Sequence, residues 1–138
     1  MKYNGKNNPR VIIIQKIYSK LINNDLDLNF PKHRYKKFIK DIVNGTLERN
    51  EVINNEINLH LKDDIDVRRI DKVFEVILKS AIFELLYKPT TSSNIIIKEY
   101  LNITRHNKQY QRWRAGEKNI TEYLNICQTQ QAISAVEG

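Results

Sequence analysis

Residues 67–87, VRRIDKVFEVILKSAIFELLY, are the most apolar stretch of the chain. Their apolar side chains recur at steps of three and four, which predicts an α-helix. The apolar stripe is broad, as is typical of a helix at the centre of a domain. Lys88-Pro89 ends the pattern, because the residue before a proline disfavours helical backbone. The stripe consists of Ile70, Val73, Phe74, Ile77, Ala81, Ile82, Leu85 and Leu86.

The N-terminal segment RVIIIQKIYSKLI, residues 10–22, follows the same helical spacing. It comes directly after Pro9, which suits a first helical turn because its missing N–H has no helical partner there. The run VIII alone would also fit a strand, but the spacing that follows it favours a helix. The predicted apolar stripe is Val11, Ile14, Tyr18 and Leu21.

A longer helical pattern begins at Lys32 and runs through Gly45 without a change of phase. A glycine inside a helix costs roughly 1 kcal/mol against alanine, so we expect Gly45 to let another helix pack closely. After Pro89, the residues TTSS supply N-cap candidates for a further helix, NIIIKEYLNI, residues 94–103. The sequence therefore predicts an all-α fold. The long stripe consists of Ile39, Ile42, Thr46, Asn50, Ile53, Ile57 and Leu61.

The net charge of +7 is concentrated at the front of the chain. Residues 1–40 hold ten Lys or Arg against Asp25 and Asp27, a balance of +8, whereas residues 41–104 have a balance of −3 and residues 105–138 one of +2. A basic front on a near-neutral body is typical of a protein that binds a polyanion such as nucleic acid. A solvated surface that aids solubility is the alternative, and charge alone does not separate the two.

The remaining composition argues against several classes of protein. The single cysteine, Cys127, excludes an internal disulfide framework and a cysteine-based zinc site. His33, His60 and His106 lack metal-ligand spacing, and the four glycines form no phosphate-binding loop. The longest uninterrupted apolar run, Val11–Ile14, is too short for a membrane span. We therefore expect a soluble cytoplasmic protein of one domain, with no catalytic or metal site and no cofactor.

Three segments together resemble the NusB family of bacterial transcription antitermination factors. RVIIIQKIYS carries Arg10, Gln15 and Tyr18 at the spacing of the family's first helix, and FIKDIVNGT, residues 38–46, resembles the family's aromatic-x-x-Asp-Leu-Leu-x-Gly-Val segment. The third and most specific segment is ILKSAIFELLYKPTTSSNIIIKEYLNI, residues 77–103. Its residues in register are Leu78, Lys79, Ala81, Glu84, Leu85, Ile95, Ile97 and Glu99.

The resemblance implies an all-α fold of two small helical bundles and a function without catalysis. It implies binding of boxA-like single-stranded RNA together with NusE, a ribosomal protein of the small subunit, within the RNA polymerase antitermination complex on rRNA operons. The implied NusE-binding residues are Asp71, Phe74 and Glu75, although Glu75 lies one position from the family's acidic residue. The implied RNA-binding residues are Lys2, Lys6, Arg10, Gln15 and Tyr18.

Two other functions are compatible with the sequence. One is a helical protein-interaction module without RNA binding, which a truncated second bundle would favour. The other is a fragment related to the N-terminal RNA-binding domain of rRNA cytosine methyltransferases, since 138 residues leave no room for a catalytic domain.

The end of the chain departs from the family. The resemblance covers about residues 10–104, which predicts a NusB-like domain over 1–104 and a divergent tail over 105–138. The family's final Phe-Val-Asn-Gly-Val-Leu-Asp helix is absent, and a second copy of EYLNI, residues 122–126, stands about where it would be. The second bundle is then incomplete, or closed by one replacement helix. We expect Ile82, Ile96 and Leu101 to lie open or loosely covered, and stability to be lower than in an intact homologue.

Overall fold

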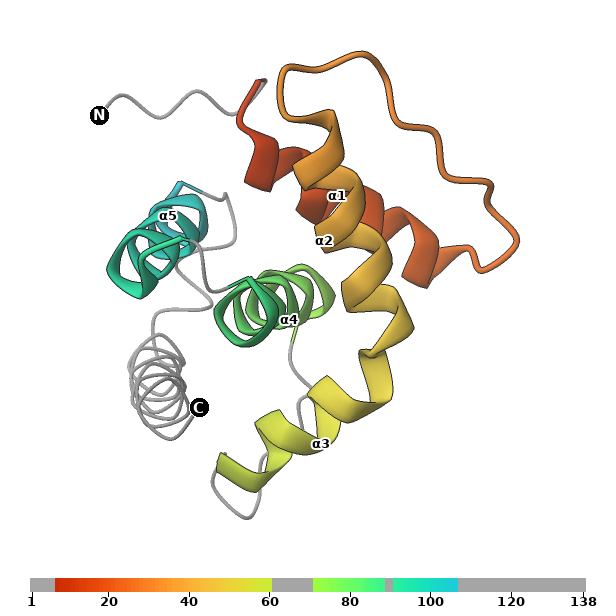
Figure 1. The fold of residues 1–138 in the computed structure, drawn as a ribbon. Helices are drawn as coiled ribbons and strands as arrows, with labels where there is room; N and C mark the ends of the chain where they lie inside the picture. The colour runs from red at the N-terminus through yellow and green to blue at the C-terminus, as the bar shows by residue number, and fades with distance from the viewer. Residues whose placement is uncertain (1–6, 61–70, 89–90, 107–138) are drawn as a thin grey trace.

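A computed structural model of the chain describes residues 7–60, 71–88 and 91–106, and every regular element in these ranges is an α-helix (Figure 1). The prediction of an all-α fold is therefore confirmed. Residues 107–138, most of the predicted tail over 105–138, lie outside the described residues, as do Lys2, Lys6 and Ile70. The helices are α1 (Pro9–Ile22), α2 (Lys36–Glu48), α3 (Asn50–His60), α4 (Lys72–Tyr87) and α5 (Ser93–Arg105).

Helix α4 is the centre of the described fold and packs against each of α1, α2, α3 and α5. All twelve residues from Phe74 to Leu85 are buried, including four polar ones. A helix that is buried on every side needs apolar residues around its whole circumference. The breadth of the apolar stripe predicted this central position correctly.

Helix α4 begins later than the sequence pattern suggested. The pattern starts at Val67, but the helix starts at Lys72 because Asp71 is its N-cap. The Asp71 carboxylate accepts hydrogen bonds from the backbone N–H groups of Val73, at 2.9 Å, and Phe74, at 3.4 Å. These bonds satisfy donors that have no partner inside the helix. Apolar periodicity does not register such a cap, so the predicted start was wrong.

The predicted long helix from Lys32 to Leu61 is in fact two helices. Helix α2 begins only at Lys36, and the chain leaves helical geometry at Arg49 before α3 begins at Asn50. Figure 1 shows α3 turning away from the line of α2. The buried side chains keep their spacing across the break, so periodicity could not reveal it.

The role predicted for Gly45 is confirmed by the packing of α2 on α4. A Cβ atom at Gly45 would lie 2.1 Å from Cζ of Phe83, far inside van der Waals contact. The Phe83 ring therefore occupies the space that any other residue at position 45 would need. Phe83 is itself stacked on Tyr87, with ring centroids 5.0 Å apart.

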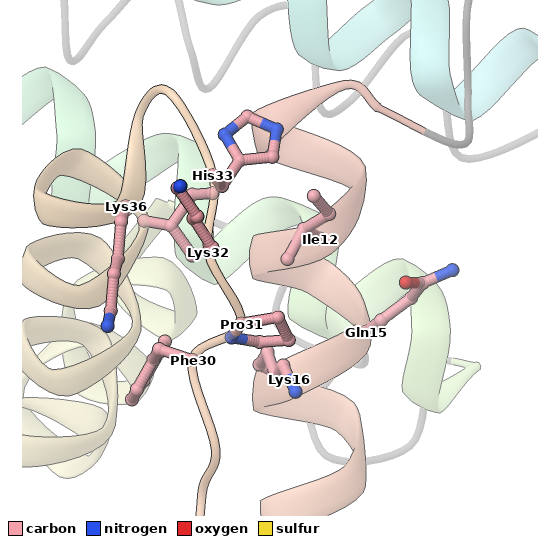
Figure 2. A pocket seen from close by; sticks show the side chains of 9 residues that line it. Ile12, Gln15, Lys16, Phe30, Pro31, Lys32, His33 and Lys36 are labelled. Carbon is pink, nitrogen blue, oxygen red and sulfur yellow. The ribbon is translucent and has the colours of Figure 1, made fainter.

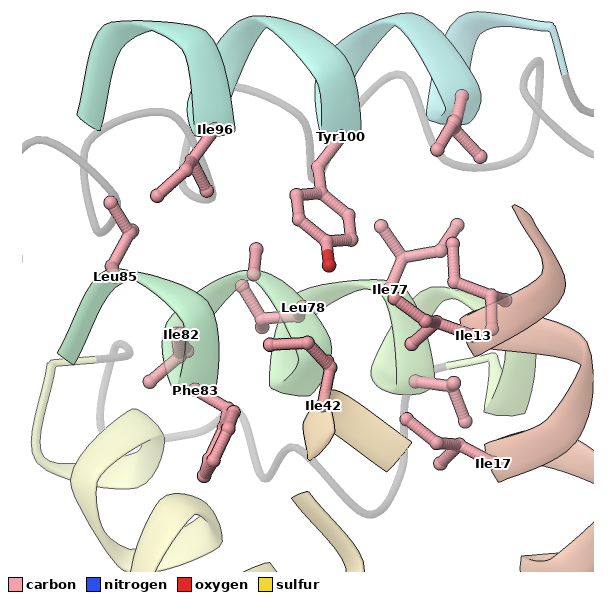
Figure 3. Packing of buried hydrophobic residues seen from close by; sticks show 14 of the residues in the cluster. Ile13, Ile17, Ile42, Ile77, Leu78, Ile82, Phe83, Leu85, Ile96 and Tyr100 are labelled. Carbon is pink, nitrogen blue, oxygen red and sulfur yellow. The ribbon is translucent and has the colours of Figure 1, made fainter. Parts of the chain in front are cut away.

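The core is built mainly from isoleucine side chains that converge on α4 from the neighbouring helices (Figure 3). In α1 the buried residues are Ile13, Ile14 and Ile17, so the face is rotated from the predicted stripe, whose Val11, Tyr18 and Leu21 are only partly buried. We expected Ile82 and Ile96 to lie open or loosely covered by the tail. The first alternative was wrong, since both are 0% exposed, and the second concerns residues outside the described ranges. Leu101 is partly buried.

Candidate nucleic-acid interface

The start of α1 is fixed to the rest of the molecule by an ion pair between Arg10 and Glu84 of α4. The Arg10 side chain donates from Nε to Oε2 of Glu84 at 3.1 Å and from Nη2 to Oε1. The side chain of Glu84 is 0% exposed and that of Arg10 is 12% exposed. Two parallel bonds between a guanidinium and a carboxylate form the strong, geometrically specific arrangement of this pair of groups.

Two aromatic rings complete the surroundings of the Arg10 guanidinium. Its Cζ lies 5.3 Å from the ring centroid of Phe38 in α2 and 5.8 Å from that of Tyr100 in α5. The guanidinium therefore joins α1 to α2, α4 and α5 at one point. Figure 3 shows the ring of Tyr100 reaching from α5 toward α4.

The protonation of this cluster follows from its burial and its charges. Burial lowers the pKa of Arg10, but the hydrogen bonds and negative charge of Glu84 outweigh it, so that the pKa is raised. Burial raises the pKa of the Tyr100 hydroxyl well above 10.0, and the charge of Glu84 adds to the rise. Arg10 is thus a permanent cation whose charge is matched internally. Its side chain holds the helix in place rather than presenting a free charge to solvent.

The other predicted RNA-binding residues of α1 lie one turn and two turns further along. Gln15 is exposed, whereas Tyr18 is partly buried against the core. Residues three apart share one face of a helix, so the structure places these two side chains as neighbours. No residue of α1 is acidic. Lys2 and Lys6 lie outside the described residues, so the structure does not place them beside Arg10.

The residues predicted to bind a protein partner lie in the first turn of α4. Phe74 is 5% exposed and Glu75 only 1% exposed. The Glu75 carboxylate pairs with Nζ of Lys79 at 2.8 Å and with Nζ of Lys72 at 3.0 Å. Asp71 is exposed, although its carboxylate also caps the helix. Of the three residues, only Asp71 offers an exposed charge.

Lys79 shows how the buried charges near this turn are held. It is 2% exposed, and its Nζ donates to Oδ1 of Asn50 at 2.6 Å as well as pairing with Glu75. Asn50 is the first residue of α3, so this network ties α3 to α4 directly after the break at Arg49. Sequence reasoning placed Asn50 in the apolar stripe and missed its pairing with Lys79. The signal was a lysine in the middle of an otherwise buried stripe, which requires a polar partner.

Across residues 7–60, 71–88 and 91–106, no group of three or more His, Cys, Asp or Glu side chains could hold a metal ion. Within the same ranges, no helix is both long and apolar enough to cross a membrane.

Comparison with known proteins gives a consistent result. The sequence model of the NusB family matches residues 2–114. The transcription antitermination protein NusB of Rickettsia akari is 26% identical over 128 residues, covering 74% of this chain and 80% of that protein. The protein of the same name from Oceanobacillus iheyensis is 32% identical over 72 residues, covering 52% of this chain and 56% of that protein.

The fold is also similar to that of a solved structure. Superposition on NusB of T. maritima gives a TM-score of 0.71 and covers 94% of this chain and 93% of that one, at 16% sequence identity. That likeness concerns the fold, while the family model covers most of the sequence, including the segments that carry Arg10 and Glu84. The chain therefore belongs to the NusB family, a family of non-enzymatic transcription antitermination factors.

Proposed function

We propose that this protein binds boxA-like single-stranded RNA together with NusE and acts in the RNA polymerase antitermination complex, in the cytoplasm, in support of rRNA operon transcription. Membership of the NusB family supports the proposal. The single observation that carries it is the charge of the N-terminal region, where α1 contains no acidic residue and residues 1–40 have a balance of +8. Such a surface attracts a polyanion and releases its counterions.

The proposed RNA contacts lie along α1 and the segment before it. Lys2 and Lys6 neutralise phosphates, and the exposed amide of Gln15 hydrogen-bonds a base edge. Tyr18 stacks through the part of its ring that the core leaves uncovered, as aromatic side chains do with unpaired RNA bases. Arg10 contributes by fixing the direction of α1 through Glu84, since its guanidinium is already paired.

The proposed NusE contact is the start of α4. Asp71 supplies the exposed carboxylate there, while Phe74 and Glu75 are buried and hold the first turn in place. A charged rim of this kind mainly sets orientation and association rate rather than the bulk of the affinity.

The RNA contact is tested by changing Lys2 and Lys6 to Ala and measuring the affinity for labelled boxA-like RNA across a salt series. The plot of log affinity against log salt has a negative slope, and its magnitude should decrease by up to about 1.4. Each single-strand phosphate that a lysine neutralises contributes roughly 0.7 to that magnitude. The matched control changes Lys37 and Lys98, two exposed lysines of α2 and α5, to Ala. Equal slopes for the two double variants would show that Lys2 and Lys6 are only solvated.

The NusE contact is tested with Asp71→Asn, which removes the charge but keeps an oxygen that can cap α4. We expect the association rate with NusE to fall, and the dependence of that rate on salt to weaken, while the melting temperature is unchanged. Asp25→Asn, at an exposed position of the connector after α1, is the control. An association rate that stays the same in Asp71→Asn would exclude the start of α4 as the charged part of the interface.

A further inference from the structure

A small cavity of about 220 Å³ lies between α1 and the connector that leads into α2 (Figure 2). Its inner wall is apolar and includes Ile39, which is 3% exposed, together with the partly buried Ile12 and Phe30. Its outer lining includes Lys32 and Lys36, both exposed. Lys16, from α1, also lines it, and we call this cavity the lysine pocket.

The lysine pocket has a positive charge that no described lining residue balances. Its described lining contains no carboxylate. Among the residues that the structure describes, none of its three lysines takes part in an ion pair, whereas Lys72, Lys79 and Lys88 are all paired with acids. Unpaired cations around a partly desolvated wall favour an anionic ligand.

The start of α2 adds to this charge. Lys36 is the first residue of α2, and the N-cap residue Tyr35 makes no side-chain hydrogen bond to the helix. The first turn of α2 also contains no acidic residue. The partial positive charge of the helix N-terminus is therefore unopposed at the edge of the lysine pocket.

The connector that forms one side of the lysine pocket is held in place before any ligand arrives. His33 accepts a hydrogen bond at Nδ1 from the backbone N–H of Tyr35, at 2.9 Å. Its other ring nitrogen then carries the proton and donates to the carbonyl oxygen of Asn7, at 3.0 Å. Pro31, two residues before His33, also restricts the backbone of the connector. Such a site loses little conformational entropy when a ligand binds.

The size and chemistry of the lysine pocket limit what can bind there. Its volume is below the roughly 300–1,000 Å³ of pockets that hold drug-sized ligands, which suits a group of one or two rings. An aromatic side chain beside apolar ones can stack on a flat ring, and lysine side chains bind phosphate groups. An acidic peptide would satisfy the lysines but would offer no flat group for the apolar wall.

We propose that the lysine pocket binds one nucleotide of single-stranded RNA, with the base against Phe30, Ile12 and Ile39 and the flanking phosphates at Lys32, Lys36 and Lys16. This inference rests on the proposed RNA-binding function and adds a specific site to it. Gln15 also lines the lysine pocket, so the site is continuous with the face of α1 assigned to RNA above.

The phosphate contacts are tested with the double variant Lys32→Gln, Lys36→Gln, assayed by fluorescence anisotropy with a boxA-like oligoribonucleotide. The magnitude of the slope of log affinity against log salt should decrease by up to about 1.4, at roughly 0.7 for each phosphate that is no longer neutralised. The control, Lys37→Gln with Lys98→Gln, makes the same change in net charge at exposed positions outside the lysine pocket. If both double variants show the same fall in affinity and slope, the lysine pocket is not an RNA site.

The base contact is tested separately with Phe30→Leu, which keeps an apolar side chain but removes the ring. The affinity for the oligonucleotide should fall about five-fold or more, the lower end of what stacking one base on an aromatic ring contributes. Adenosine monophosphate at high concentration should shift the methyl resonances of Ile12 and Ile39 in the wild-type protein. Ribose 5-phosphate, which lacks the base, should leave those methyl signals in place.

The outcomes separate this inference from the proposed function. If Lys2→Ala with Lys6→Ala weakens RNA binding while Phe30→Leu and the Lys32, Lys36 double variant do not, RNA binding stands and the lysine pocket assignment is overturned. If the wild-type protein binds no RNA, with or without NusE, both are overturned. If adenosine monophosphate binds as tightly as the oligonucleotide, the ligand is a free nucleotide and the assignment to RNA is overturned.

Discussion

Arg10 illustrates how far a single side chain can be interpreted from the sequence. The resemblance marked it as functional, but its partner Glu84 is 74 positions away, so no local spacing predicts the pair. The signal that was available is the position of Glu84 inside an apolar stripe, because a buried carboxylate requires a cation or hydrogen-bond donors. Gln15 lies outside the predicted apolar stripe of α1 and is exposed, although the stripe itself was rotated from the buried face.

The Arg10–Glu84 pair should make single and double substitutions differ sharply. Glu84→Gln leaves a mostly buried guanidinium without its charge partner, and breaking a buried pair in this way costs about 3–5 kcal/mol of unfolding free energy. Arg10→Met combined with Glu84→Leu removes both charges and should cost far less. Urea denaturation of the three proteins checks this. A double variant less stable than Glu84→Gln would contradict the interpretation.

The Tyr100 hydroxyl should make the stability of the protein depend on alkaline pH. Its pKa is raised in the folded state by burial, whereas the unfolded chain releases the proton near about pH 10. The stability due to the neutral hydroxyl is therefore complete below that pH and is lost as pH rises toward the folded pKa, by up to about 1.36 kcal/mol per pH unit.

Denaturation of wild type and Tyr100→Phe between pH 9 and pH 11 measures this contribution. The phenylalanine variant lacks the hydroxyl, so its unfolding free energy should depend less steeply on pH. The comparison uses this slope and not the absolute stability of the variant. Tyr35→Phe, at a tyrosine that is 47% exposed, is the control and should keep the wild-type slope. Identical slopes for wild type and Tyr100→Phe would refute the assignment.

At the scale of the elements, the contact between α2 and α4 depends on the absence of a side chain. Gly45→Ala should destabilise the protein by about 1–3 kcal/mol, because the added methyl meets the ring of Phe83 in a packed core. Phe83→Leu in the same chain should recover part of that stability by making room. Asn44→Ala, at the exposed neighbouring position, is the control. If chemical denaturation showed Gly45→Ala to be as stable as wild type, α2 and α4 would be able to move apart enough for the added methyl without a cost in stability.

The elements also show which structural information periodicity contains. Spacing at three and four predicted helical structure over α1, α4 and α5, and over α2 and α3 as one helix, together with the central place of α4. These predictions follow from which side chains avoid water. It missed the break at Arg49 and the start of α4 at Lys72, because these depend on backbone hydrogen bonds. The guanidinium of Arg49 lies 4.6 Å from the ring centroid of Tyr87, a contact 38 positions away that the sequence does not mark.

For the whole molecule, the packing predicts an order of local stability. Helix α4 packs against four helices, whereas α3 packs only against α2 and α4 in the described structure, apart from weaker contacts. Regions with fewer packed neighbours open at lower free energy. Hydrogen exchange should therefore be slowest over Phe74–Leu85 and clearly faster over Asn50–His60. Equal protection of the two helices would show that the molecule opens as a single unit.

The central place of α4 also constrains how the protein is made. Ribosomes complete α1, α2 and α3 before the helix that all three cover, and 27 residues separate the end of α3 at His60 from the end of α4 at Tyr87. At about 5–20 residues per second, translation leaves the nascent chain without that surface for roughly 1–5 s. During this interval α4 is not yet present to bury side chains such as Ile13, Ile42 and Ile57. A chain stopped after His60 should consequently be cut by protease, or captured by a chaperone, far faster than the completed protein.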